Sequence, residues 1–186
     1  MANTKTTLLT AEERRSLYSP PTLNESERKE YFTFSQDEIK VLKSFKKTEY
    51  SVYYAISLAF FKLKYTLVNF KYRDVTLERQ CVMQRYFPGK SIPRRFPTDK
   101  DTIARIENKV LQSVNFSRFK SDISDKIMKI MQKQSVAYPR QRQLCKAFLN
   151  VIINANVAIP SLTTVQDCVS DIWNTALSST IKKYYR

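Results

Sequence analysis

The feature that most constrains the fold of this chain is its near absence of glycine. Gly89 is the only glycine among 186 residues, whereas an average protein contains about 7% glycine. Tight hairpins and β-bulges rely on glycine because it adopts positive φ angles without a steric penalty. Helices joined by turns of proline, serine and asparagine need far less of it. The composition therefore predicts an all-α fold, and the length fits one domain or two small ones.

The charged side chains indicate binding to a polyanion rather than catalysis. The chain has 32 lysines and arginines against 17 aspartates and glutamates, a net charge of +15, and no histidine. Without histidine there is no Ser-His or Cys-His pair for nucleophilic catalysis, and no glycine-rich phosphate loop is present. We therefore expect a chain that is not an enzyme, that needs no cofactor, and that has no catalytic or metal-binding residues.

The cysteines and the most apolar segment indicate a cytoplasmic protein. Cys81, Cys145 and Cys168 are odd in number and far apart, which is typical of small buried side chains in a reducing compartment. The apolar run at residues 52–61 is too short for a bilayer, which requires about 20 residues. We interpret it as a buried core helix, and we expect no membrane association.

Capping signals and prolines predict a succession of helices. Thr10, Asn24 and Ser35 are each followed three residues later by a glutamate, which is the pattern of a capping box. The helices are expected at about residues 11–18, 25–32, 36–44, 49–68, 76–87, 99–114, 121–136, 139–154 and 163–183.

A cluster of prolines divides this succession into two modules. Pro88, Pro93 and Pro97 cannot occupy a helix interior, so residues 89–97 are predicted to be a basic, proline-rich linker. It would join an N-terminal helical module at residues 1–88 to a second module at residues 98–186, both helix-turn-helix-like. Both halves are basic, with net charges of +8 for residues 1–95 and +7 for residues 96–186, and each is expected to bind DNA.

Two candidate DNA-binding groups lie in the N-terminal half and at the linker. Lys43, Lys46 and Lys47 surround a short turn between two expected helices, which is the layout of a helix-turn-helix. The second helix is rich in aromatic residues, so the alternative is a core helix flanked by phosphate-binding lysines. The linker group consists of Lys90, Arg94 and Arg95. It is either an arm that enters a narrow minor groove or an ordinary solvated linker.

The third candidate group begins a helix in the second half. Arginine and glutamine form bidentate hydrogen bonds with guanine and adenine edges, and both recur in the set Arg140, Gln141, Arg142, Gln143 and Lys146. The alternative is a hydrophilic first turn. A stripe of Lys126, Lys129 and Lys133 is either a solvated helix face or a face that follows phosphates.

Three motifs, in order along almost the whole chain, resemble the N-terminal region of the large replicative bacterial transposases of the Tn-three family. LLTAEERR at residues 8–15 resembles the opening of that region, and VYYAISL at residues 52–58 resembles its "LGFALQL" helix. NVAIPSLTT at residues 156–164 resembles "RVLLPGVTTL", with Arg140 upstream. The chain departs from the family at Ser51, Tyr53 and Ser161, where the family has arginine, glycine and glycine.

The resemblance implies a specific function. The chain would recognise the terminal inverted repeats of a transposon as sequence-specific double-stranded DNA, in a bacterial, nucleoid-associated setting. Strand transfer would belong to a separate downstream domain with an acidic triad, and a homodimer of the full-length protein is left open. The alternative to this function is a helical protein-interaction adaptor or a nonspecific nucleic-acid binder.

Overall fold

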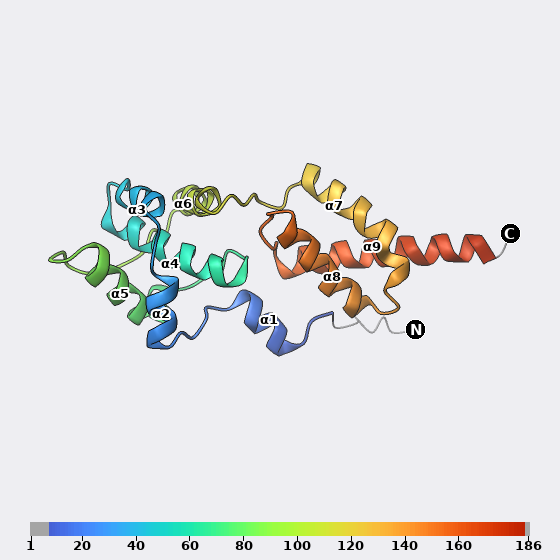
Figure 1. Cartoon of the computed structure of the whole chain (residues 1–186), viewed down its shortest axis with the longest axis horizontal. Coiled ribbons are helices and arrows are strands. Elements are labelled where there is room, and N and C mark those ends of the chain that lie inside the picture. Colours follow the sequence, from blue (N-terminus) through green and yellow to red (C-terminus); the bar gives the residue numbers. More distant parts are fainter. Residues whose placement is uncertain (1–7, 185–186) are drawn as a thin grey trace. The chain divides into compact units, whose positions relative to one another are not determined.

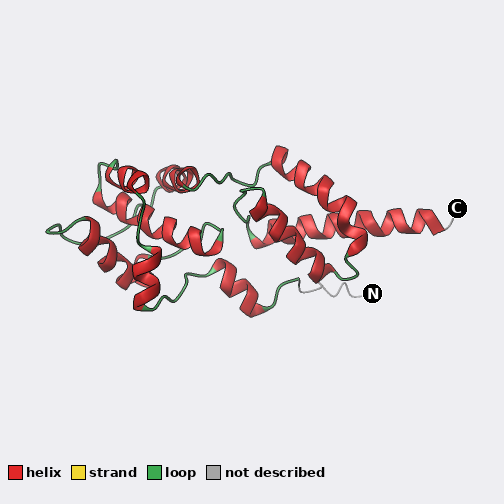
Figure 2. Cartoon of the chain, in the orientation of Figure 1, coloured by secondary structure: helices red, strands yellow, loops and turns green. Residues whose placement is uncertain are grey.

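The computed structural model describes residues 8–184 and confirms the all-α prediction. It is 68% helical, and the described residues contain no strand (Figure 2). In order along the chain, the α-helices are α1 (Ala11–Tyr18), α2 (Glu25–Tyr31), α3 (Gln36–Lys43), α4 (Thr48–Lys64), α5 (Thr76–Tyr86), α6 (Lys100–Ser113), α7 (Ser121–Gln134), α8 (Gln141–Asn154) and α9 (Leu162–Tyr184) (Figure 1). Two short 3₁₀ turns, at Tyr72–Val75 and Ser135–Ala137, complete the set.

All three predicted capping boxes are present, which explains where the first helices begin. The backbone N–H of Thr10 donates to Glu13 Oε2 at 2.8 Å, and the backbone N–H of Glu13 donates to the Thr10 hydroxyl at 3.1 Å. Asn24 and Ser35 make the same reciprocal bonds at the starts of α2 and α3. Each box satisfies two backbone donors that a helix start leaves without partners.

Three helices are followed by a residue other than glycine in the left-handed backbone conformation, a position where glycine is usual. Tyr65, Asn115 and Asn156 have φ angles of 56°, 57° and 53° and follow α4, α6 and α8. After α6, the N–H of Phe116 donates to the carbonyl of Leu111, which is the long hydrogen bond of a Schellman motif. Tyr65 ends α4 at Lys64, before the predicted end near residue 68. The single glycine, at φ +80°, follows Pro88 in the turn after α5, the arrangement of a type II turn.

The chain forms two compact units, and each is described by itself. One unit spans Ser16–Ser117, and the other combines residues up to Arg15 with the segment from Arg118 onward. The expected division at residues 88 and 98 does not coincide with this boundary. The reason is that α6 packs along α4, so a helix assigned by sequence to the second module belongs to the core of the first unit.

Helix α4 is the centre of the unit at Ser16–Ser117. Every side chain from Ser51 to Phe61 is buried, and α2, α3, α5 and α6 all contact this helix. That burial confirms the core-helix interpretation for residues 51–61 and leaves this stretch no exposed face for a DNA groove, whereas Thr48, Glu49 and Tyr50 in the first turn are half-buried. None of the helices in the described part of the chain is long and apolar enough to cross a membrane.

The second unit is built from α7, α8 and α9. Contacts join all three helices, and their apolar faces form a core of Ile127, Met131, Leu144, Phe148, Ile152, Val165, Val169 and Ile172. Helix α8 begins after Arg140, so Pro139 precedes the helix rather than lying in its first turn. Leu8 and Leu9 are also buried, each with 3% of its surface exposed.

Candidate nucleic-acid interface

The turn between α3 and α4 presents a group of lysines to solvent. Lys43 lies in the last turn of α3, Lys46 and Lys47 lie in the turn itself, and all three are exposed. The Lys47 ammonium is 5.2 Å from the centre of the Tyr50 ring, a weak cation–π contact at an exposed site. The flexible lysine side chains are therefore available to an external anion.

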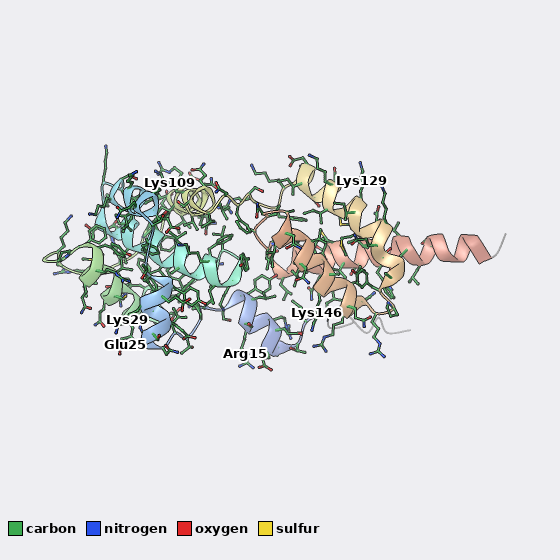
Figure 3. The ribbon with its side chains drawn as sticks, in the orientation of Figure 1. Arg15, Glu25, Lys29, Lys109, Lys129 and Lys146 are labelled. Atoms are coloured by element: carbon green, nitrogen blue, oxygen red, sulfur yellow. The ribbon has the colours of Figure 1, made fainter. Side chains whose placement is uncertain are left out.

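Helix α6 adds two cations to this turn that the sequence analysis did not identify. Arg105 and Lys109 are one helical turn apart on the exposed face of α6, whereas Thr102, Ile106 and Val110 form its buried face. Their spacing was visible in the sequence, but their proximity to the α3–α4 turn was not, because α6 had been assigned to the other module. Figure 3 labels Lys109.

Between the turn and α6 lies an open hollow of about 260 Å³, which we call the α6 hollow. Its lining consists of Ser44, Phe45, Lys46, Tyr50, Thr102, Arg105, Ile106 and Lys109. Three of these side chains are cationic and none is a carboxylate. Arg105 Nη2 donates to the Thr102 hydroxyl at 3.0 Å, and the Lys109 ammonium lies 5.2 Å from the centre of the Phe45 ring. The hollow thus combines an apolar, aromatic floor with a cationic rim.

The predicted linker is fixed to the unit at Ser16–Ser117 rather than free. Phe96 is buried and packs edge-to-face against Tyr53, Phe70 and Tyr72, with ring centres 5.2–5.6 Å apart. The Tyr72 hydroxyl also donates to the carbonyl of Pro93. An arm that threads a minor groove would have to leave these contacts, so the structure disfavours that hypothesis.

The basic side chains of this segment are nevertheless exposed. Lys90, Arg94 and Arg95 all face solvent, and the Lys90 ammonium is 5.5 Å from the centre of the Phe87 ring. Lys90 lines a different hollow from Lys46, one formed by the end of α5 and the turn at Gly89. The two groups are therefore separate features of the same unit.

In the other unit, the start of α8 carries the third predicted group. Arg140 is the N-cap residue, and its side chain makes no capping hydrogen bond. Arg142, Gln143 and Lys146 are exposed and Gln141 is half-buried. The first turn contains no acidic residue, so the positive end of this helix is not neutralised by its own sequence.

A carboxylate from α1 instead binds two cations of this group. Arg142 Nη2 donates to Glu13 Oε1 at 2.9 Å, and Lys146 Nζ lies 3.3 Å from the same oxygen. The backbone N–H of Thr10 and the Arg142 guanidinium, in that order of effect, lower the pKa of Glu13 from 4.5 to about 2. One oxygen of Glu13 therefore accepts the capping-box hydrogen bond from Thr10, and the other pairs with the two cations of α8. Figure 3 labels Lys146.

The lysine stripe on α7 is solvent-facing. Lys126, Lys129 and Lys133 are exposed, while Ile127 and Met131 are buried on the opposite side. Ile130, expected on the apolar side, is 46% exposed. Within the described residues none of the three lysines forms an ion pair, so this stripe provides a reference set of solvated cations.

The structure offers no activated nucleophile among the cysteines. Burial raises the pKa of all three thiols, to about 11 for Cys145, which disfavours the reactive thiolate. Within residues 8–184, no three cysteine, aspartate or glutamate side chains come close enough to hold a metal ion.

A family model described as a domain of unknown function, DUF4158, matches residues 8–172, which is most of the chain and includes residues of both units. The curated proteins contain no match.

Proposed function

The chain belongs to the DUF4158 family, and from this premise and the surfaces described above we propose that it binds double-stranded DNA. The observation that carries the proposal is the cationic rim of the α6 hollow. Lys46, Arg105 and Lys109 come from two segments far apart in the sequence and converge on a surface without a carboxylate. A site of this charge attracts phosphates, and neutralising phosphates releases counterions from the DNA.

The two units would contribute differently to binding. Around the α6 hollow, together with Lys43 and Lys47, the cations are lysines and one arginine that suit contacts to the phosphate backbone. At the start of α8, Arg140, Gln141 and Gln143 have the side chains that read base edges. Arg142 and Lys146 would join them by exchanging the Glu13 carboxylate for a DNA phosphate or a base.

We further propose that the DNA is the terminal inverted repeat of a transposon. Support comes from the three motifs that resemble the Tn-three transposases. They occur in the same order as in those transposases, within residues 8–164, which is almost the span of the DUF4158 match. On this proposal the chain is the binding part of a transposase and does not itself cut or join DNA.

Fluorescence anisotropy on two labelled duplexes tests the proposal. One duplex carries the terminal repeat that flanks the gene, and the other is a scrambled duplex of equal length and composition, both at about 150 mM salt. We expect the repeat to bind at least about tenfold more tightly, within the range of a few specific base contacts. Equal affinity for the two duplexes would remove the repeat-recognition proposal, and no binding to either would favour an adaptor that binds a protein.

A further inference from the structure

The α6 hollow has features that a phosphate-binding surface alone does not require. Besides its three cations, it is lined by the rings of Phe45 and Tyr50 and by the buried side chain of Ile106. Phosphate oxygens gain nothing from an apolar floor. A ligand that matches both parts of the hollow must have a flat or apolar body and an anionic group attached to it.

We propose that the α6 hollow accommodates a single unpaired nucleotide of a DNA strand. Its base would stack on Phe45, and its phosphate would contact Arg105 and Lys109. This inference rests on the proposed DNA-binding function and names the state of the DNA that one surface recognises. Aromatic side chains stack on any base because every base has a π-face.

The size of the hollow favours one nucleotide over a larger ligand. Its volume of about 260 Å³ lies just below the range of pockets for drug-sized molecules, about 300–1,000 Å³. A single base fits such a space, whereas an interior base pair of an undistorted duplex presents only its edges to a protein ring. The nucleotide must therefore be extrahelical.

The position of the Lys109 side chain allows a base to take its place on the Phe45 ring. In the free protein its ammonium lies over the Phe45 ring at 5.2 Å, a contact that contributes little at an exposed site. A stacked base would replace the ammonium on the ring, and the ammonium would then pair with the phosphate of the same nucleotide. Arg105 is already oriented by its hydrogen bond to Thr102.

A duplex with one extra, unpaired 2-aminopurine tests this inference against the perfect duplex of the same sequence. We expect the full chain to bind the bulged duplex about tenfold more tightly, within the effect of stacking one base on an aromatic ring. The 2-aminopurine fluorescence should fall in the complex. Phe45→Leu should reduce the preference for the bulged duplex to below about twofold.

A matched control exists in the same unit. Phe87 is also a half-buried ring beneath a lysine, with Lys90 at 5.5 Å, so Phe87→Leu should retain the full preference for the bulged duplex. Tyr50→Leu, on the other ring of the hollow, provides a second test if circular dichroism shows that Phe45→Leu has lost helix. It should also weaken the preference.

The outcomes separate the inference from the function on which it rests. Tight, equal binding of both duplexes would overturn the inference and leave DNA binding standing, as would a preference that survives both ring variants. Failure to bind either duplex would remove both. Binding of free dAMP as tight as that of the bulged duplex would overturn the assignment to a DNA strand, as would displacement of the bulged duplex by an acidic, tryptophan-containing peptide.

Discussion

The two units carry basic groups of similar composition that differ in what surrounds them. Around the α6 hollow, Lys46, Arg105 and Lys109 share their surface with hydroxyls and rings but no carboxylate. At the start of α8, Arg142 and Lys146 both contact the carboxylate of Glu13. A count of basic residues therefore does not measure how much charge is ready for an anion, because one well-placed glutamate engages two cations.

The difference also separates the roles that the two surfaces can have. Unpaired lysines on flexible side chains suit contacts to phosphates at any sequence. At α8 the ion pairs with Glu13 hold the Arg142 side chain in a defined place, and a ligand must offer a better partner than a carboxylate to displace it. We expect the α6 hollow to dominate affinity and the start of α8 to contribute more to selectivity.

The largest expected effect comes from removing the three cations of the hollow. A triple change of Lys46, Arg105 and Lys109 to glutamine should weaken binding roughly 100-fold at about 150 mM salt, since each phosphate contact contributes a slope of about 0.9 in log affinity against log salt. The slope itself should fall by about 3. Anisotropy titrations between about 50 and 200 mM salt measure both quantities.

The α7 stripe provides the control for this change. Changing Lys126, Lys129 and Lys133 to glutamine removes the same net charge from exposed positions of the other unit. The slope of log affinity against log salt should then stay within about 1 of the slope of the unaltered protein. If the two triple variants lose equal affinity, the net charge of the chain, and not the hollow, determines binding.

A second, smaller effect concerns the start of α8. Arg140→Ala should lower the preference for the repeat over the scrambled duplex by about tenfold, within the ~1–3 kcal/mol of one bidentate base contact. Arg142→Ala should lower it less, because Glu13 already engages that guanidinium. Competition titrations with both duplexes measure the preference. Equal losses would show that the Glu13 contact does not restrain Arg142 in the complex.

The sequence predicted the local features of this fold because their causes are local. The boxes at Thr10, Asn24 and Ser35 depend on a glutamate three residues away, and all three are confirmed. The scarcity of glycine predicted helices, and the structure shows how the chain manages without it, since Asn115 and Asn156 adopt the left-handed conformation that asparagine tolerates better than most residues.

The features that sequence reasoning missed depend on contacts between distant segments. Prolines at residues 88–97 indicate a break in helix, which is correct, but they do not reveal that Phe96 packs into an aromatic cluster. Glu13 satisfied a local pattern, so its second partner, 129 residues away, gave no signal. The α6 hollow was missed for the same reason, because Arg105 joins Lys46 only after α6 packs beside α3 and α4.

One substitution should reduce the difference between the two units in how much positive charge is available to DNA. Glu13→Gln keeps a side-chain oxygen for the capping box but removes the charge that engages Arg142 and Lys146, so affinity for DNA should rise roughly threefold to tenfold, the range expected from freeing two exposed ion pairs. Glu12→Gln, an exposed neighbour on the same helix turn, changes the net charge equally and should have little effect. An equal gain in both variants would attribute the result to net charge alone.

The smallest expected effect is on stability, and it tests the charge of the Glu13 carboxylate without DNA. Its pKa is about 2 in the folded chain against an ordinary 4.5, so the folded state favours the ionised carboxylate and gains stability above pH 4.5. That stability is lost as the pH falls from 4.5 through about 2, and only below that pH is Glu13 mostly protonated in both states. Thermal unfolding across this pH window should show the Tm of the unaltered protein and that of Glu13→Gln converging as the pH falls. Glu12 bonds neither the Thr10 N–H nor the Arg142 guanidinium, so the Tm of Glu12→Gln should follow that of the unaltered protein at each pH. A difference between the first two that persists at the lowest pH would mean that Glu13 acts through its hydrogen bonds rather than its charge, and the electrostatic distinction between α8 and the α6 hollow would lose its basis.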